Sequence, residues 1–307
     1  MAIRIDPELT AAELRAALYA GELVVLTRIA AVGELAAYTA AELERLFAPH
    51  PPERAHEHLS PEAMAALLGR WKPAFMRDPR VNELVKAIIA GAGLDPAGTL
   101  YDLPKFRTSF PSDHLTTGVA FAFPWHRDTW YAAPAAQINW WLPVSRLSER
   151  NAMGFDLAHF DRAVRNDSAG FDYYALNANR SNIAKQVGRE LQARPGATDH
   201  QVADEVVLLP EPGAIVLFSG AQLHRSISNT SGLARYSVDF RTVDALDVAE
   251  GRGAPLVDVE CTGTSIRDFH GVIDGEQLPE ELIRAVYGDP PADAVLVYEP
   301  PPADAPV

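Results

Sequence analysis

The stretch FPWHRDTWY, residues 123–131, places a histidine and an aspartate two residues apart among aromatic side chains. In a β-strand the side chains of residues i and i+2 point to the same face, so we expect His126 and Asp128 to converge and Arg127 to point away. A facial-triad metal site takes two histidines and one carboxylate. Taken alone, the pair is more often a buried His–Asp hydrogen bond than a metal site.

The surrounding sequence predicts a fold made mainly of β-strands with flanking helices. Short runs rich in Val, Ile, Phe, Trp and Tyr, separated by Pro and Gly, extend from about Leu103 onwards and favour a sandwich or barrel. The first hundred residues have Ala-rich helical spacing, with one short strand in ELVVLTRI, residues 22–29. We expect a single domain over residues 1–307, made of a mostly helical flank at 1–100, a β core at 101–245 with a polar insertion or lid at 161–202, and a Pro-rich tail at 285–307.

His224 is the leading candidate for the second histidine, because it follows a strand-and-turn pattern, PGAIVLFSGAQ, residues 212–222. Arg235 and Ser237 come next, and the turn signal SNTSG, residues 228–232, predicts a hairpin that returns Arg235 towards His224. A guanidinium pairs well with a carboxylate, and a hydroxyl adds a hydrogen bond. An ion pair between Arg235 and Asp239 is the structural alternative. The rival histidines, which lack a downstream arginine of this kind, are His114, His159, His200 and His270.

Together these motifs resemble the iron(II)/2-oxoglutarate-dependent oxygenases, and most of all the phytanoyl-CoA dioxygenase family, over roughly residues 100–245. The segment ERNAMGFDLAHF, residues 149–160, matches that family's Asn-Gly turn in part, with His159 in place of its final histidine. The resemblance implies a double-stranded β-helix core (jelly-roll, cupin-like). It also implies Fe(2+) held by His126, Asp128 and His224, and 2-oxoglutarate held at its far carboxylate by Arg235 and Ser237.

The activity that this resemblance implies is O2-dependent hydroxylation of an unactivated C–H bond in a small-molecule metabolite, with ascorbate as a reductant in vitro. Asn139 is a candidate for a cosubstrate oxygen. Candidate substrate-pocket residues are Trp130, which a strand would place in phase with His126 and Asp128, and Lys105 and Arg107 on the preceding strand. Desaturation, epimerisation and ring formation by the same oxidant stay open. So does a non-catalytic jelly-roll binding protein.

Composition narrows the classes of partner. Lys and Arg number 27 against 41 Asp and Glu, a net charge of −14, which argues against nucleic-acid and anionic-membrane binding. The single cysteine, Cys261, excludes an internal disulfide and fits a reducing compartment. No signal peptide is evident, and no apolar run approaches the roughly 18 residues needed to cross a bilayer. We therefore expect a cytoplasmic enzyme, monomeric or homodimeric, that acts on a small molecule.

Overall fold

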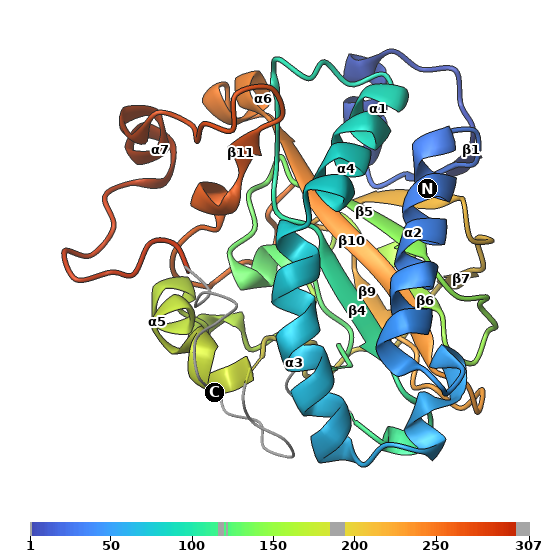
Figure 1. Ribbon diagram of the computed structural model, residues 1–307. Coiled ribbons are helices and arrows are strands. Elements are labelled where there is room, and N and C mark those ends of the chain that lie inside the picture. The colour runs from blue at the N-terminus through green and yellow to red at the C-terminus, as the bar shows by residue number, and fades with distance from the viewer. Residues whose placement is uncertain (1, 116–119, 121, 185–193, 299–307) are drawn as a thin grey trace.

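Helices from the N-terminal third of the chain cover one face of a large β-sheet. The computed structural model describes residues 2–115, 120, 122–184 and 194–298. Figure 1 shows α2, α3 and α4 lying across the strands β4, β5 and β10. The helices of this third are α1 (Ala11–Tyr19), α2 (Ala30–Phe47), α3 (Pro61–Arg77) and α4 (Pro79–Gly91).

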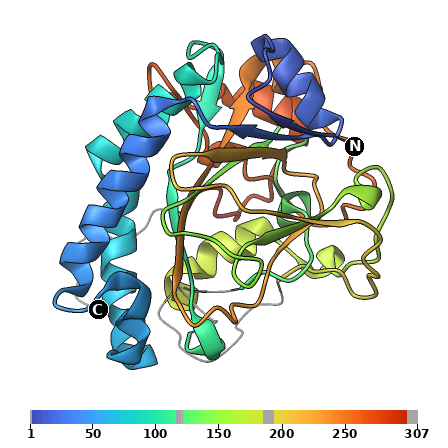
Figure 2. The same cartoon turned by 90° about the vertical axis from the view of Figure 1, so that its right-hand side faces the viewer.

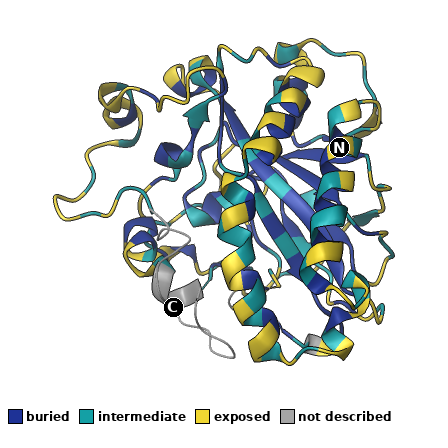
Figure 3. Ribbon diagram, viewed as in Figure 1, coloured by how far each residue is buried: buried dark blue, intermediate teal, exposed yellow. Residues whose placement is uncertain are grey.

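Three of these helices, α1, α3 and α4, begin at side-chain caps, whereas α2 begins after Ile29 without one. Thr10 and Glu13 form a capping box at α1, Ser60 accepts a hydrogen bond from the backbone N of Ala63 at α3, and Asp78 caps α4. The apolar faces of α2–α4 pack on one face of the large sheet, where Trp140, Tyr236 and Phe240 are buried. In Figure 3 the outer sides of these helices are exposed and the strands beneath them are buried. Burial of this helical layer therefore supplies much of the hydrophobic core.

The large sheet has the strand order β1-β2-β8-β5-β10-β3-β11, and β4 pairs with part of β10. The long strand β10 is its centre, since it pairs antiparallel with β3, β4 and β5. The first two strands bring the N-terminal region into the sheet, because β2 pairs with β8. The bounds are β1 (Ile3–Ile5), β2 (Leu23–Leu26), β3 (Thr99–Tyr101), β4 (Lys105–Ser109), β5 (Ile138–Pro143), β8 (Ile215–Ser219), β10 (Arg235–Asp244) and β11 (His270–Gly271).

A smaller antiparallel sheet has the order β7-β6-β9, with β6 at Met153–Asp156, β7 at Glu205–Leu208 and β9 at His224–Ser226. Its apolar side chains pack against those of the large sheet in one cluster, in which Phe155 meets Trp141 and Phe218. Seen from the side, α2–α4 lie on one side of β10 and the smaller sheet lies on the other (Figure 2).

Two expectations about the fold need correction. The chain is a mixed α/β structure with two sheets, and among the described residues helices account for more of the chain than strands, so "mainly β" is too narrow. The predicted hairpin between β9 and β10 is also not formed. β9 pairs with β6 in the small sheet, and β10 pairs with β5 in the large one. The Asn- and Gly-containing turn is present, but it carries the chain from one sheet to the other.

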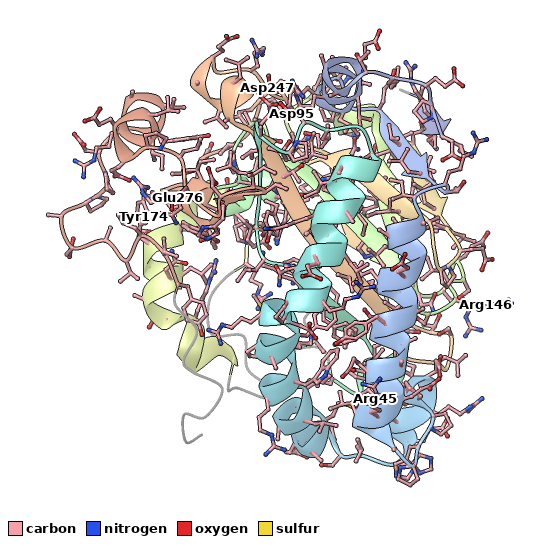
Figure 4. The ribbon with its side chains drawn as sticks, turned by 45° about the horizontal axis from the view of Figure 1, so that its top comes forward. Arg45, Asp95, Arg146, Tyr174, Asp247 and Glu276 are labelled. Atoms are coloured by element: carbon pink, nitrogen blue, oxygen red, sulfur yellow. The ribbon has the colours of Figure 1, made fainter. Side chains whose placement is uncertain are left out.

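The C-terminal part surrounds one end of the large sheet. It contains α6 (Ala245–Ala249) and α7 (Glu280–Tyr287), while α5 (Tyr173–Ala184) belongs to the insertion. Asp247 of α6, labelled in Figure 4, accepts hydrogen bonds from Nε of Arg15 at 2.6 Å and Nε of Arg252 at 2.7 Å, so it ties α1 to α6. Residues 185–193 of the expected lid and 299–307 of the expected tail lie outside the described residues. Among the helices described, none is long and apolar enough to cross a membrane.

Candidate metal centre

His126 and His224 face each other on two paired backbone segments. They exchange two backbone hydrogen bonds of 2.9 Å as an isolated antiparallel bridge, and their ring centroids are 4.1 Å apart. Oδ1 of Asp128 lies 3.6 Å from Nε2 of His126 and 3.9 Å from Nε2 of His224. The structure therefore brings the three side chains that the sequence singled out to one point.

Backbone carbonyls decide how the two imidazoles point. Nδ1 of His126 lies 2.8 Å from the carbonyl oxygen of Pro124, and Nδ1 of His224 lies 2.8 Å from that of Gln222. A carbonyl oxygen only accepts, so each Nδ1 carries a proton, and a neutral ring then presents its Nε2 lone pair to Asp128. Burial and the neighbouring His126 lower the pKa of His224 to about 3, which keeps that ring neutral at physiological pH.

Two amide side chains hold the carboxylate of Asp128. Its Oδ2 accepts hydrogen bonds from Nδ2 of Asn139 at 2.8 Å and from Nε2 of Gln137 at 3.0 Å, which leaves Oδ1 directed at the histidines. Burial alone would raise the pKa of Asp128, but the nearby positive charge of Arg241 helps to lower it far below its usual range. Asn139 was expected to meet a cosubstrate oxygen. Its amide N–H donates to Asp128, and a contact with the cosubstrate stays a prediction. Gln137 was not among the predicted site residues, although it also holds Asp128.

The backbone around Asp128 differs from the expected strand. Asp128 begins a short 3-10 helix, Asp128–Tyr131, in which side chains three residues apart lie on the same side. Tyr131 therefore joins Asp128 at the cavity, whereas Trp130 turns away from it. Trp130 is fully buried and donates from Nε1 to Oδ1 of Asp258 at 2.8 Å. The structure thus places Trp130 in the core, contrary to its predicted role in the substrate pocket.

Arg235 lies in the same cavity as the three candidate ligands. Its side chain is buried, Nη1 donates to Oγ of Ser237 at 2.7 Å, and Nε has no hydrogen-bond partner. Burial lowers its pKa to about 10, so the guanidinium stays charged at neutral pH. The alternative pairing with Asp239 is not what the structure shows. Asp239 instead accepts two hydrogen bonds from Arg107, at 2.6 and 3.1 Å.

The cavity has a volume of about 490 Å³ and is lined by charged and aromatic side chains. Lys105 and Arg107 both line it, and each is paired with a carboxylate, Lys105 with Asp102 and Arg107 with Asp239. The segment at 161–202, expected as an insertion or lid, and the C-terminal segment add cavity residues that were not singled out individually from the sequence. They are Phe171, Tyr173, Leu176, Arg180, Arg194, Ser265, Asp268, Phe269 and Tyr298.

No protein-family profile and no curated protein sequence matches the chain. Among solved structures it is similar to EvdO2 from Micromonospora carbonacea var. aurantiaca in complex with 2-oxoglutarate, with 14% identity over 75% of this chain and 89% of that one and a TM-score of 0.46. It is also similar to the epimerase SnoN in complex with Fe3+, alpha ketoglutarate and nogalamycin RO, with 14% identity over 76% of this chain and 84% of that one and a TM-score of 0.40.

A third similar structure is the non-heme alpha ketoglutarate dependent carbocyclase SnoK, with 15% identity over 56% of this chain and 62% of that one and a TM-score of 0.34. The described residues of this chain include a His-Asp-His cluster of possible metal ligands, His126, Asp128 and His224. These likenesses are remote, because each TM-score is below 0.5, and the functional proposal rests instead on the geometry of the site.

Proposed function

We propose that this chain is a non-haem iron(II)- and 2-oxoglutarate-dependent dioxygenase that hydroxylates an unactivated C–H bond of a small-molecule metabolite. One observation carries the proposal. Two imidazole lone pairs and one carboxylate oxygen converge, while a buried, charged guanidinium without a carboxylate partner among the described ion pairs lies in the same cavity.

The chemistry of the donor atoms fits a cation. Nε2 of His126, Nε2 of His224 and Oδ1 of Asp128 are all lone-pair donors, and such atoms repel one another unless a positive charge lies between them. Two imidazoles and one carboxylate are the ligand set of non-haem iron(II) sites, with positions left for other ligands. These three residues would hold Fe(2+), which together with O2 and 2-oxoglutarate would supply the oxidising equivalents.

The other cavity residues have roles that follow from their contacts. The guanidinium of Arg235 binds the far carboxylate of 2-oxoglutarate, because a planar fork matches a carboxylate and burial strengthens the pair. Asn139 and Gln137 keep Oδ1 of Asp128 directed at the histidines. The aromatic side chains of Trp141 and Phe218 line the cavity and exclude water from it.

The test compares metals in protein stripped by a chelator. Fe(2+) with ascorbate should restore 2-oxoglutarate-dependent succinate release, and Zn(2+) should not, because zinc has no redox chemistry. Asp128→Ala, His126→Ala and His224→Ala should each lose iron with an unchanged circular-dichroism spectrum. Full activity of zinc-loaded, iron-free protein would remove the oxygenase proposal. Succinate release by Asp128→Ala at the wild-type rate would do the same.

The reaction outcome needs its own measurement, because substrate placement decides it. Hydroxylation adds an oxygen atom to the substrate, desaturation or ring formation removes two hydrogens, and epimerisation leaves the mass unchanged. Mass spectrometry of products from a metabolite pool incubated with enzyme, Fe(2+) and 2-oxoglutarate separates these outcomes. Absence of succinate formation with every pool, in protein that binds both iron and 2-oxoglutarate, would favour a non-catalytic binding protein.

A further inference from the structure

A second cluster of one aspartate and two histidines lies outside the candidate metal centre. Asp156 ends β6, His159 ends the 3-10 helix Leu157–His159, and His200 lies at the far end of the insertion. Oδ2 of Asp156 lies 3.1 Å from Nδ1 of His159 and 2.9 Å from Nε2 of His200. The carboxylate is fully buried and the His200 side chain is 4% exposed, so the cluster is a built, interior feature.

Hydrogen bonding by itself leaves this cluster crowded. Oδ2 of Asp156 faces the ring nitrogens of His159 and His200 and also the backbone N of Ala203 at 3.3 Å, although a carboxylate oxygen has two lone pairs. Oδ1 is already occupied by the backbone N of Ala158 at 2.9 Å. A cation bound to the three side chains would relieve this crowding of Oδ2.

We propose that Asp156, His159 and His200 form a second metal site that takes Zn2+. Two imidazoles and one carboxylate suit Zn2+, which completes a tetrahedral set with water. The separations of 2.9 and 3.1 Å between donor atoms are a few tenths of an ångström below the about 3.3 Å between two ligands of a tetrahedral ion at about 2.0–2.1 Å, so a small shift of the side chains would admit the ion. They are shorter than the 3.6 and 3.9 Å separations at the candidate iron centre.

The position of this site gives it a structural consequence. His159 and His200 flank the insertion, and Phe171, Tyr173 and Arg194 from within that insertion line the cavity. The cluster also touches the turn between β8 and His224, because Nε2 of Gln222 donates to the backbone oxygen of Asp156 at 2.8 Å. Zn2+ bound here would hold both ends of the insertion to β6, and so keep one wall of the cavity in place.

The two centres can be separated with substitutions. His126→Ala with His224→Ala removes the first centre. His159→Asn with His200→Gln keeps a donor N–H for Asp156 at each position but removes the imidazoles, so it preserves a hydrogen-bonded cluster and abolishes a metal site. His58→Ala is the matched control, since His58 is exposed and belongs to neither cluster.

Zn2+ content after equilibrium dialysis against ZnCl2 is the measurement, read by plasma mass spectrometry and requiring no turnover. Protein without the first centre should retain one equivalent and show a Zn2+-dependent rise in melting temperature. Adding His159→Asn and His200→Gln should abolish the Zn2+ equivalent and the Zn2+-dependent rise in melting temperature. Adding His58→Ala should leave both unchanged. The proposal is overturned if folded protein without the first centre binds no Zn2+, or if the Asn/Gln pair keeps the equivalent. If the first centre binds no metal, wild type and the His126→Ala, His224→Ala protein should have equal Zn2+ contents. That result would count against the first centre and leave the second one intact.

Discussion

Nη1 of Arg235 donates to Oγ of Ser237 at 2.7 Å, while Nε of the same guanidinium has no partner among the described residues. The two side chains are two residues apart on β10 and therefore share one face of the strand. Ser237 is fully buried, and its hydroxyl oxygen fixes the orientation of the guanidinium by accepting the hydrogen bond from Nη1. We infer that Ser237 orients Arg235 and that Arg235 alone meets the anion. The sequence reading had expected both residues to bind it.

Arg235→Ala should weaken 2-oxoglutarate binding without loss of metal. Losing a charge-assisted pair in a partly desolvated pocket costs about 2–4 kcal/mol, or roughly thirty- to a thousandfold in affinity. Arg235→Lys keeps the charge but not the fork, so its affinity should fall between those of Arg235→Ala and wild type. Calorimetric titration of 2-oxoglutarate into metal-loaded protein measures the change.

Arg225→Ala serves as the control for that titration. Arg225 lies on β9 and pairs with Glu205 at 2.9 Å in the small sheet, so its removal should leave cosubstrate affinity unchanged. An unaltered affinity in Arg235→Ala would take Arg235 out of the cosubstrate site. Arg241, which also lines the cavity, would then be the next candidate.

Ser237→Ala should reduce 2-oxoglutarate affinity by about 1 kcal/mol, or roughly fivefold, because it removes one neutral hydrogen bond. If the serine acts through the arginine, the same change in an Arg235→Ala background should have almost no effect. A double-mutant cycle on cosubstrate affinity measures this coupling. Additive losses would mean that Ser237 contacts the cosubstrate directly.

Asn139→Ala should weaken metal binding about 10- to 100-fold, because its amide orients the carboxylate of Asp128. Metal affinity can be followed by competition with a chromophoric chelator. Asn151→Ala is a suitable control, since Asn151 is also buried but bonds to Ser148 and Ser231 in a loop. If Asn139 served the cosubstrate instead, the metal affinity would be retained and only the 2-oxoglutarate affinity would fall.

The lowered pKa of His224 predicts the pH dependence of the metal-free protein. The ring takes up a proton at about pH 3 when folded and at the ordinary value of 6.5 when unfolded, so between these values the unfolded state holds one more proton. The free energy of unfolding should therefore fall as the pH falls, by about 1.5 kcal/mol between about pH 6.5 and 5. Urea denaturation of chelator-treated wild type and His224→Gln isolates this contribution. Equal losses in the two proteins would contradict it.

The residue types at the centre were readable from local sequence. His126 and Asp128 are separated by one residue, and that spacing limits how far apart their side chains can be, whether the backbone is a strand or a 3-10 turn. The helix at Pro61 follows a Ser cap for the same kind of reason, since a cap bonds within one turn. His126 and Asp128 are therefore close together even though the expected strand at Asp128 is a 3-10 helix.

Strand pairing decided the sheet topology and the contacts between the site residues, because it joins segments far apart in the chain. SNTSG predicts a turn, but whether β10 pairs with β9 or crosses to β5 depends on burying two apolar sheet faces against each other. β4 and β5 pair with opposite edges of β10. This arrangement lets Asn139 on β5 bond to Asp128, and it lets Arg107 on β4, in place of Arg235, pair with Asp239. Sequence alone indicated most of the side chains that are proposed to carry the chemistry. The tertiary structure decided which of them face the cavity and which hold the others in place, since burial leaves each charge and amide to bond with whatever neighbour the sheets provide.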